Sequence, residues 1–117
     1  MKDFKKLVIW QHAMDIIDKT YDLFGRIPDE VELGLSGQAV RAAISIASNI
    51  AEGNARRSEK DKKRFMEIAL GSSFELETHI LVVQRRGWAE AVQVDELVLD
   101  IRREQSMIQG FMDELKA

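Results

Sequence analysis

The sequence predicts an all-α protein, an antiparallel up-down-up-down four-helix bundle. Three observations support this fold class. Apolar residues recur every three or four positions along most of the 117-residue chain, glycines and turn residues separate four such stretches, and no useful run alternates like a strand. Apolar content of 45% with one proline is typical of a folded, helix-rich protein. We expect one domain over residues 1–117.

The first helix is predicted from Phe4 to Phe24. Its apolar residues follow a 3-4-3-4-3 spacing, which indicates a coiled-coil-like seam. These residues are Leu7, Trp10, Met14, Ile17, Tyr21 and Phe24. Gly25 should end the helix, and Pro28 should begin an acidic turn.

The second helix is the most apolar part of the chain. Between Leu33 and Glu52 the only charge before Glu52 is Arg41, although 32% of the chain is charged. The polar residues from Gln38 to Glu52 fall within an arc of roughly 100°, and the other residues of that span are Ala, Ile or Val. We expect a helix from a Ser36 N-cap to a left-handed Gly53 C-cap. It should be buried on more than one side, in part by neighbouring copies of the chain.

The last two helices have clear boundaries. The third should begin at a Ser58 N-cap and stop at Gly87, with Gly71 in its middle marking a close approach of another helix. Its predicted seam is Phe65, Ile68, Ala69, Ser72, Leu76, Ile80 and Val83. The fourth carries the stripe Val94, Leu97, Val98, Ile101, Ile108, Phe111, Met112 and Leu115.

Polar side chains gather where the second and third helices face each other. If these helices form a hairpin, Arg41 lies near Glu75, and we predict an ion pair between them. The full set is Gln38, Arg41, Ser45, Asn49, Glu52 and Glu75. Two interpretations stay open: a polar layer that fixes helix register, or a pocket for a small anion or nucleotide.

The connection between the second and third helices is basic. Residues 54–64 hold six cations and two acids, a net charge of +4, so the remaining chain carries −7 of the total of −3. The cations are Arg56, Arg57, Lys60, Lys62, Lys63 and Arg64. This segment is either a solvated helix start or a surface that contacts RNA phosphates. No aromatic residue is interleaved with the cations, so stacking on bases is not predicted.

Catalytic, metal and cofactor sites are not predicted. The chain has no cysteine, and neither His12 nor His79 has the Glu three positions earlier that a di-iron bundle requires. No serine-protease-like spacing or phosphate-binding glycine loop occurs. The apolar run from Leu7 to Trp10 is too short for a signal peptide, so we expect a cytoplasmic protein that binds no membrane.

Several short motifs resemble one protein family. They are Trp10 with Ala13; Pro28 and Glu30; Gly34-Leu35, Gln38, Arg41-Ala42-Ala43 and Ser45-Ile46; Asn49 to Gly53 with Arg56; Ala69 to Ser72; and Glu75 to Thr78. The chain thereby resembles the four-helix-bundle proteins encoded within intervening sequences of bacterial 23S ribosomal RNA genes. Related bundles include the accessory protein of diversity-generating retroelements, which is pentameric and binds nucleic acid.

The resemblance implies a homopentamer and contact with RNA. One departure is visible, because the family often has two adjacent arginines where this chain has Val40 and Arg41. Because one of these two positive charges is missing here, any nucleic-acid contact that would depend on it is weakened. We expect a non-enzymatic homopentamer that binds RNA or an RNA-associated protein. The alternatives are an enzyme of small-anion or nucleic-acid chemistry that uses the polar pocket, and a purely structural assembly.

Overall fold

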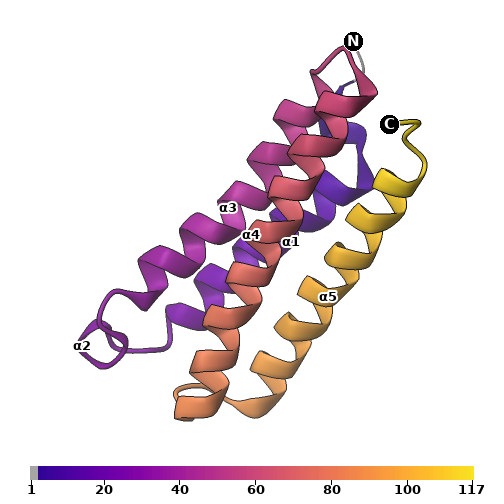
Figure 1. Cartoon of the computed structure of the whole chain (residues 1–117). Coiled ribbons are helices and arrows are strands. Elements are labelled where there is room, and N and C mark those ends of the chain that lie inside the picture. The colour runs from indigo at the N-terminus through magenta and orange to yellow at the C-terminus, as the bar shows by residue number, and fades with distance from the viewer. Residues whose placement is uncertain (1–2) are drawn as a thin grey trace.

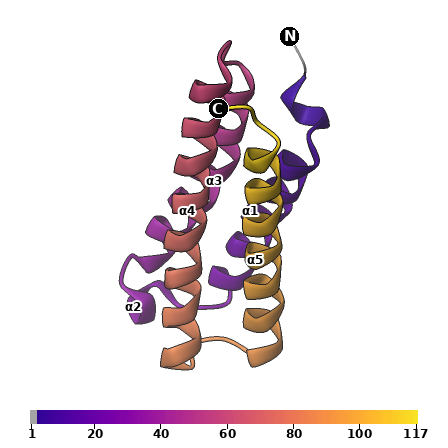
Figure 2. The same cartoon turned by 45° about the vertical axis from the view of Figure 1, so that its right-hand side comes forward.

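The computed structural model describes residues 3–117 as an elongated helical bundle of 45 × 20 × 20 Å. Four long helices run up and down: α1 (Val8–Phe24), α3 (Leu35–Asn54), α4 (Glu59–Arg86) and α5 (Ala91–Asp113) (Figures 1 and 2). Two short elements are η1 (Phe4–Lys6) and α2 (Asp29–Glu32). Each long helix packs on two others, α1 and α4 both lying against α3 and α5. The all-α bundle predicted from the sequence is confirmed.

All four long helices contribute to one apolar core. Ile16, Ile46, Leu76 and Ile101 come one from each helix, and each is fully buried. Trp10 and Trp88 are half-buried and pack on the edge of this core. The core is therefore shared by the whole bundle and holds its helices in register.

The first helix differs from its prediction in two ways. It does not run unbroken from Phe4, because η1 ends at an extended Leu7 and α1 begins after it. The buried face is also turned from the predicted seam: Met14 and Tyr21 are 38% and 55% exposed. The buried residues are Ile9, Ala13, Ile16, Ile17, Thr20, Leu23 and Phe24. Small Ala13 and Thr20 on this face let neighbouring helices approach closely.

The turn before α3 is more structured than the predicted acidic turn. It contains α2, and Leu33 and Gly34 then both adopt left-handed backbone conformations, with φ of 50° and 91°. The expected Ser36 N-cap is wrong, since Gly34 occupies that position. Instead the Glu32 carboxylate accepts hydrogen bonds from the Ser36 backbone N–H and hydroxyl. This acid satisfies a free amide at the positive end of the α3 dipole.

Gly53 in α3 and Gly71 in α4 do not have the roles predicted for them. Gly53 is not a left-handed cap, because α3 continues to Asn54 and Ala55 caps it in a right-handed conformation. A Cβ at Gly53 would lie 2.8 Å from the Phe65 Cβ. A Cβ at Gly71 would meet no described atom within 4 Å. The close approach between helices is thus at Gly53, where α3 meets the start of α4.

The ends predicted for α4 are confirmed. The Ser58 hydroxyl accepts a hydrogen bond from the Asp61 N–H at 3.1 Å, and Gly87 ends the helix with φ of 68°. The predicted seam of α4 is correct at Ala69, Leu76, Ile80 and Val83. Ile68, in contrast, is 42% exposed, because the buried stripe passes through Met66 and Ser73 instead.

Helix α3 is covered largely within a single chain. It lies between α1 and α4, so that Ala47 is only 4% exposed, whereas Ile44 is 44% exposed. The other exposed positions of the helix are Gly37, Gln38, Arg41, Ser48 and Glu52. The low polarity of α3 is therefore explained mainly by two flanking helices, and its requirement for a neighbouring copy is smaller than the sequence indicates.

Candidate functional site

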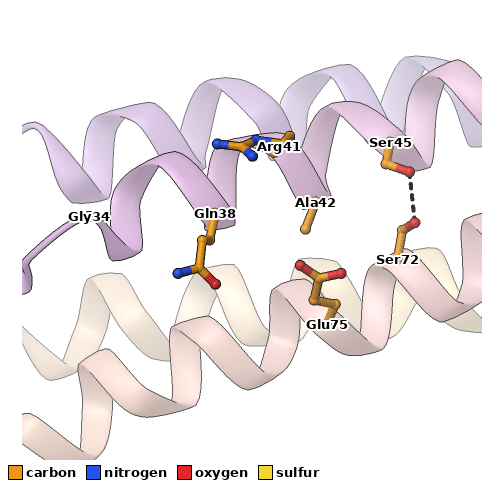
Figure 3. A pocket seen from close by; sticks show the side chains of 7 residues that line it. All are labelled: Gly34, Gln38, Arg41, Ala42, Ser45, Ser72 and Glu75. Carbon is orange, nitrogen blue, oxygen red and sulfur yellow. Dashed lines mark hydrogen bonds between the residues drawn. The ribbon is translucent and has the colours of Figure 1, made fainter.

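Four of the six predicted polar-layer residues line one open groove between α3 and α4 (Figure 3). The groove has a volume of about 720 Å³ and is lined by Gly34, Gln38, Arg41, Ala42, Ser45, Ser72 and Glu75. Asn49 lies next to it and bonds to one of the lining residues. Glu52 lies outside it, exposed, one turn further along α3.

Hydrogen bonds at one end of the groove join the two helices. The hydroxyls of Ser45 and Ser72 are 2.8 Å apart, which ties α3 to α4 directly (Figure 3). Asn49 Nδ2 donates to the backbone oxygen and hydroxyl of Ser45, at 2.8 and 3.0 Å. These half-buried groups satisfy one another, as buried polar groups must. This part of the set acts as a layer that fixes register.

The predicted Arg41–Glu75 ion pair is not formed within the described chain. Glu75 pairs instead with His79 one turn later, at 3.2 Å between Oε2 and Nε2. The Arg41 side chain is exposed and follows α3, away from the Glu75 carboxylate (Figure 3). An exposed arginine keeps its hydration, so no buried charge demands a partner here.

The six predicted cations gather at the end of the bundle where α3 turns into α4 (Figure 1). Arg56 and Arg57 lie in the connection itself, and Lys60, Lys62, Lys63 and Arg64 occupy the first turns of α4. Within residues 3–117, no Asp or Glu carboxylate forms an ion pair with any of the six. Their charges are consequently available to an anion from solution.

Three of these cations have defined positions. Arg56 donates from Nε to the Glu52 backbone oxygen at 3.2 Å, and its guanidinium lies 4.7 Å from the centre of the Phe65 ring. Lys62 and Lys63 reach the backbone oxygens of Asn54 and Ala117, each at 3.5 Å. Neutral backbone carbonyls thus hold Arg56 and Lys62 without cancelling their charge.

A cavity of about 460 Å³ opens beside these cations, and we name it the end cavity. Its lining comes from both ends of the described chain and from the α3–α4 connection. The lining residues are Leu7, Asn54, Ala55, Arg56, Arg57, Glu59, Lys62, Phe111 and Leu115. Nothing in the sequence places Leu7 and Phe111 beside the basic connection, because only the antiparallel packing brings these segments together.

A buried acid in α5 forms a second polar cluster, which the sequence did not reveal. Glu104 is fully buried, and its Oε1 lies 2.9 Å from Nδ1 of His12 on α1. Its Oε2 has no hydrogen-bond partner within the described chain. Asp100 lies one turn before Glu104, pairs with Lys19, and is 3.9 Å from the other ring nitrogen of His12. Glu104 lies in the apolar stripe of α5 between Ile101 and Ile108. An acid at such a position was the sequence signal that could have predicted this cluster.

Burial controls the protonation of this cluster. It raises the pKa of Glu104 to about 8, and it lowers the pKa of His12 below the usual 6.5, although Asp100 opposes the second shift. Both groups are therefore neutral at pH 7. The Glu104 O–H then donates to His12 Nδ1, which leaves the ring proton on Nε2, the nitrogen that faces Asp100.

Within residues 3–117, no three His, Asp or Glu side chains are grouped closely enough to hold a metal ion. None of the helices in this range combines the length and the apolar character that a membrane span requires.

Four long antiparallel helices with a basic end define a small helical-bundle protein with a candidate polyanion-binding surface. A model of the 23S rRNA-intervening sequence protein family matches residues 5–110, so the chain belongs to this family. The comparison with curated proteins gives no match.

The fold is similar to that of a solved structure. That structure is of a protein of unknown function from the S23 ribosomal protein family of Bacteroides thetaiotaomicron, with a TM-score of 0.82 and 20% sequence identity. The match covers 90% of this chain and 98% of that one. At this sequence identity the likeness shows a shared fold and carries no statement about function.

Proposed function

We propose that this protein is a non-enzymatic, homo-oligomeric binding module that contacts the RNA backbone through its basic end. The observation that carries the proposal is the concentration of positive charge there: six cations lie within nine positions, on a chain whose residues outside 54–64 total −7. Such a local positive field on an acidic protein attracts phosphates to one end and repels them elsewhere.

Exposed apolar side chains support assembly with further copies. Phe74 is 52% exposed and Leu81 stands two turns later on the same face of α4, while Ile44 of α3 and Ile68 of α4 are also exposed. Large side chains repeated along one helix face favour contact with another protein surface. A pentamer is the assembly that the family resemblance implies, and it would repeat the basic end five times around one rim.

Charge reversal tests RNA contact directly. We expect single-stranded RNA to bind at low ionic strength and the Arg56→Glu/Arg57→Glu protein to bind far more weakly, with the slope of log K against log salt shallower by about 1.4. Arg85→Glu/Arg86→Glu is the matched control, since these adjacent arginines lie at the opposite end of α4.

Binding by both variants with wild-type affinity would refute the proposed surface. Light scattering of the same samples gives the subunit count with and without RNA. A single chain at micromolar concentration in both samples would refute the homo-oligomer.

A further inference from the structure

The end cavity adds an apolar wall to the basic surface. Leu7, Phe111 and Leu115 line one side of it, and each is half-buried, so part of each side chain stays open to the cavity. The Phe111 ring supplies an aromatic residue that the basic segment itself lacks. A volume of about 460 Å³ lies within the range of pockets that bind small organic ligands.

The α3–α4 connection and the first turn of α4 supply the cationic part of the lining, which is in part preorganised. The Arg56 guanidinium is held between the Glu52 carbonyl and the Phe65 ring, and Lys62 is held by a backbone carbonyl. Arg57 is exposed and forms no ion pair within residues 3–117. Fixed cations beside an apolar wall suit a ligand with a flat apolar body and an attached anion.

One acid also lines the cavity. The Glu59 carboxylate accepts a hydrogen bond from the Lys116 backbone N–H, which orients it toward the C-terminal segment. Three cations against this one acid leave the lining net positive. The charge thus favours an anionic ligand over a neutral or cationic one.

We propose that the end cavity binds one unstacked nucleotide of single-stranded RNA, with its base against Phe111 and its phosphate on Arg56 and Arg57. A nucleotide combines a flat π face with an adjacent anion, and protein sites for single-stranded RNA pair aromatic or guanidinium planes with cations in this way. The inference rests on the proposed RNA contact and deepens it, since backbone binding alone requires no cavity.

The test compares a short RNA hexamer with a hexamer of the same ribose-phosphate backbone that lacks bases. With wild-type protein we expect the base-containing RNA to bind about tenfold more tightly, and both to share one salt slope. Phe111→Leu should remove most of this preference while it keeps an apolar contact with the core. Tyr21→Leu, at an exposed aromatic residue of α1 outside the cavity, is the control and should retain the preference.

The outcomes separate the two proposals. If neither hexamer binds the wild-type protein at low ionic strength, the proposed function fails and this inference fails with it. If both bind equally with a steep salt dependence, backbone contact stands and the nucleotide site is refuted. Thermal unfolding of Phe111→Leu checks its fold. Leu115→Ala provides a second cavity variant, and a base preference unchanged in both variants would also refute the site.

Discussion

The buried Glu104 carboxyl predicts that stability falls as pH rises. Its folded-state pKa of about 8 exceeds the ordinary 4.5, so between these values the folded protein holds a proton that the unfolded chain has released. Its contribution to stability is complete below about pH 4.5 and declines by ~1.4 kcal/mol per pH unit until the folded state also ionises near pH 8. At pH 7 the free energy of unfolding is therefore lower by about 3 kcal/mol than it would be with a permanently neutral group at this position.

Glu104→Gln removes this titration while it keeps the shape of the side chain. We expect the free energy of unfolding of the variant minus that of the wild type to be nearly constant below pH 4. The difference should rise through neutral pH and level off above pH 9, with about 3 kcal/mol gained by pH 7. Urea titrations followed by circular dichroism from about pH 3 to 10, at one protomer concentration, measure the difference. Asp100, Lys19 and Arg103 surround the pair, but the subtraction cancels most of their effect.

Two observations would refute this reasoning. One is a variant-minus-wild-type difference that does not change with pH. The other concerns the infrared spectra at pH 7. The wild type should show a protonated-carboxyl band that Glu104→Gln does not show, and a wild-type spectrum without this band would refute the reasoning. Glu96→Gln, at an exposed position of the same helix, is the control and should give a flat difference.

Three further substitutions test the packing by thermal or urea unfolding. Gly53→Ala should cost about 1–3 kcal/mol, because the new methyl would overlap side chains at the start of α4, and no measurable loss would show that the contact is loose. Gly71→Ala should stabilise by up to ~1 kcal/mol through helix propensity, and a loss would instead place a neighbouring copy against that position. Arg41→Ala should change stability by less than about 0.5 kcal/mol, because the side chain is exposed and forms no ion pair within residues 3–117; a loss of several kcal/mol would show that the pair with Glu75 does form.

Local signals predicted both ends of α4 but not the buried face of α1. The boundaries of α4 follow from a hydroxyl cap at Ser58 and the left-handed freedom of Gly87, both properties of a few adjacent residues. The buried face of α1 could not be chosen in this way. Met14 and Tyr21 continue one plausible stripe, and Ala13 and Thr20 continue another. Only contact with α3 and α5 decides between them.

The candidate site, too, could be predicted only in part from the sequence. Its charge could be predicted, since the six cations lie within nine positions of the sequence and therefore stay at one end of the bundle. The end cavity could not, because Leu7 and Phe111 reach it from distant parts of the chain. The same holds for the contact of His12 with Glu104, which joins residues 92 positions apart.

The C-terminal segment lies against the first turn of α4, where Lys116 bonds to Glu59 and Ala117 to Lys63 (Figure 1). An affinity tag or fluorescent protein fused after Ala117 would therefore sit over the basic end and shield it from a probe. The connection around Trp88 and Ala89 is at the far end of the bundle, roughly a full helix length away. Labels inserted there leave the basic end unobstructed. If RNA binding differs between protein tagged after Ala117 and protein labelled at this connection, shielding of the basic end by the tag explains the difference.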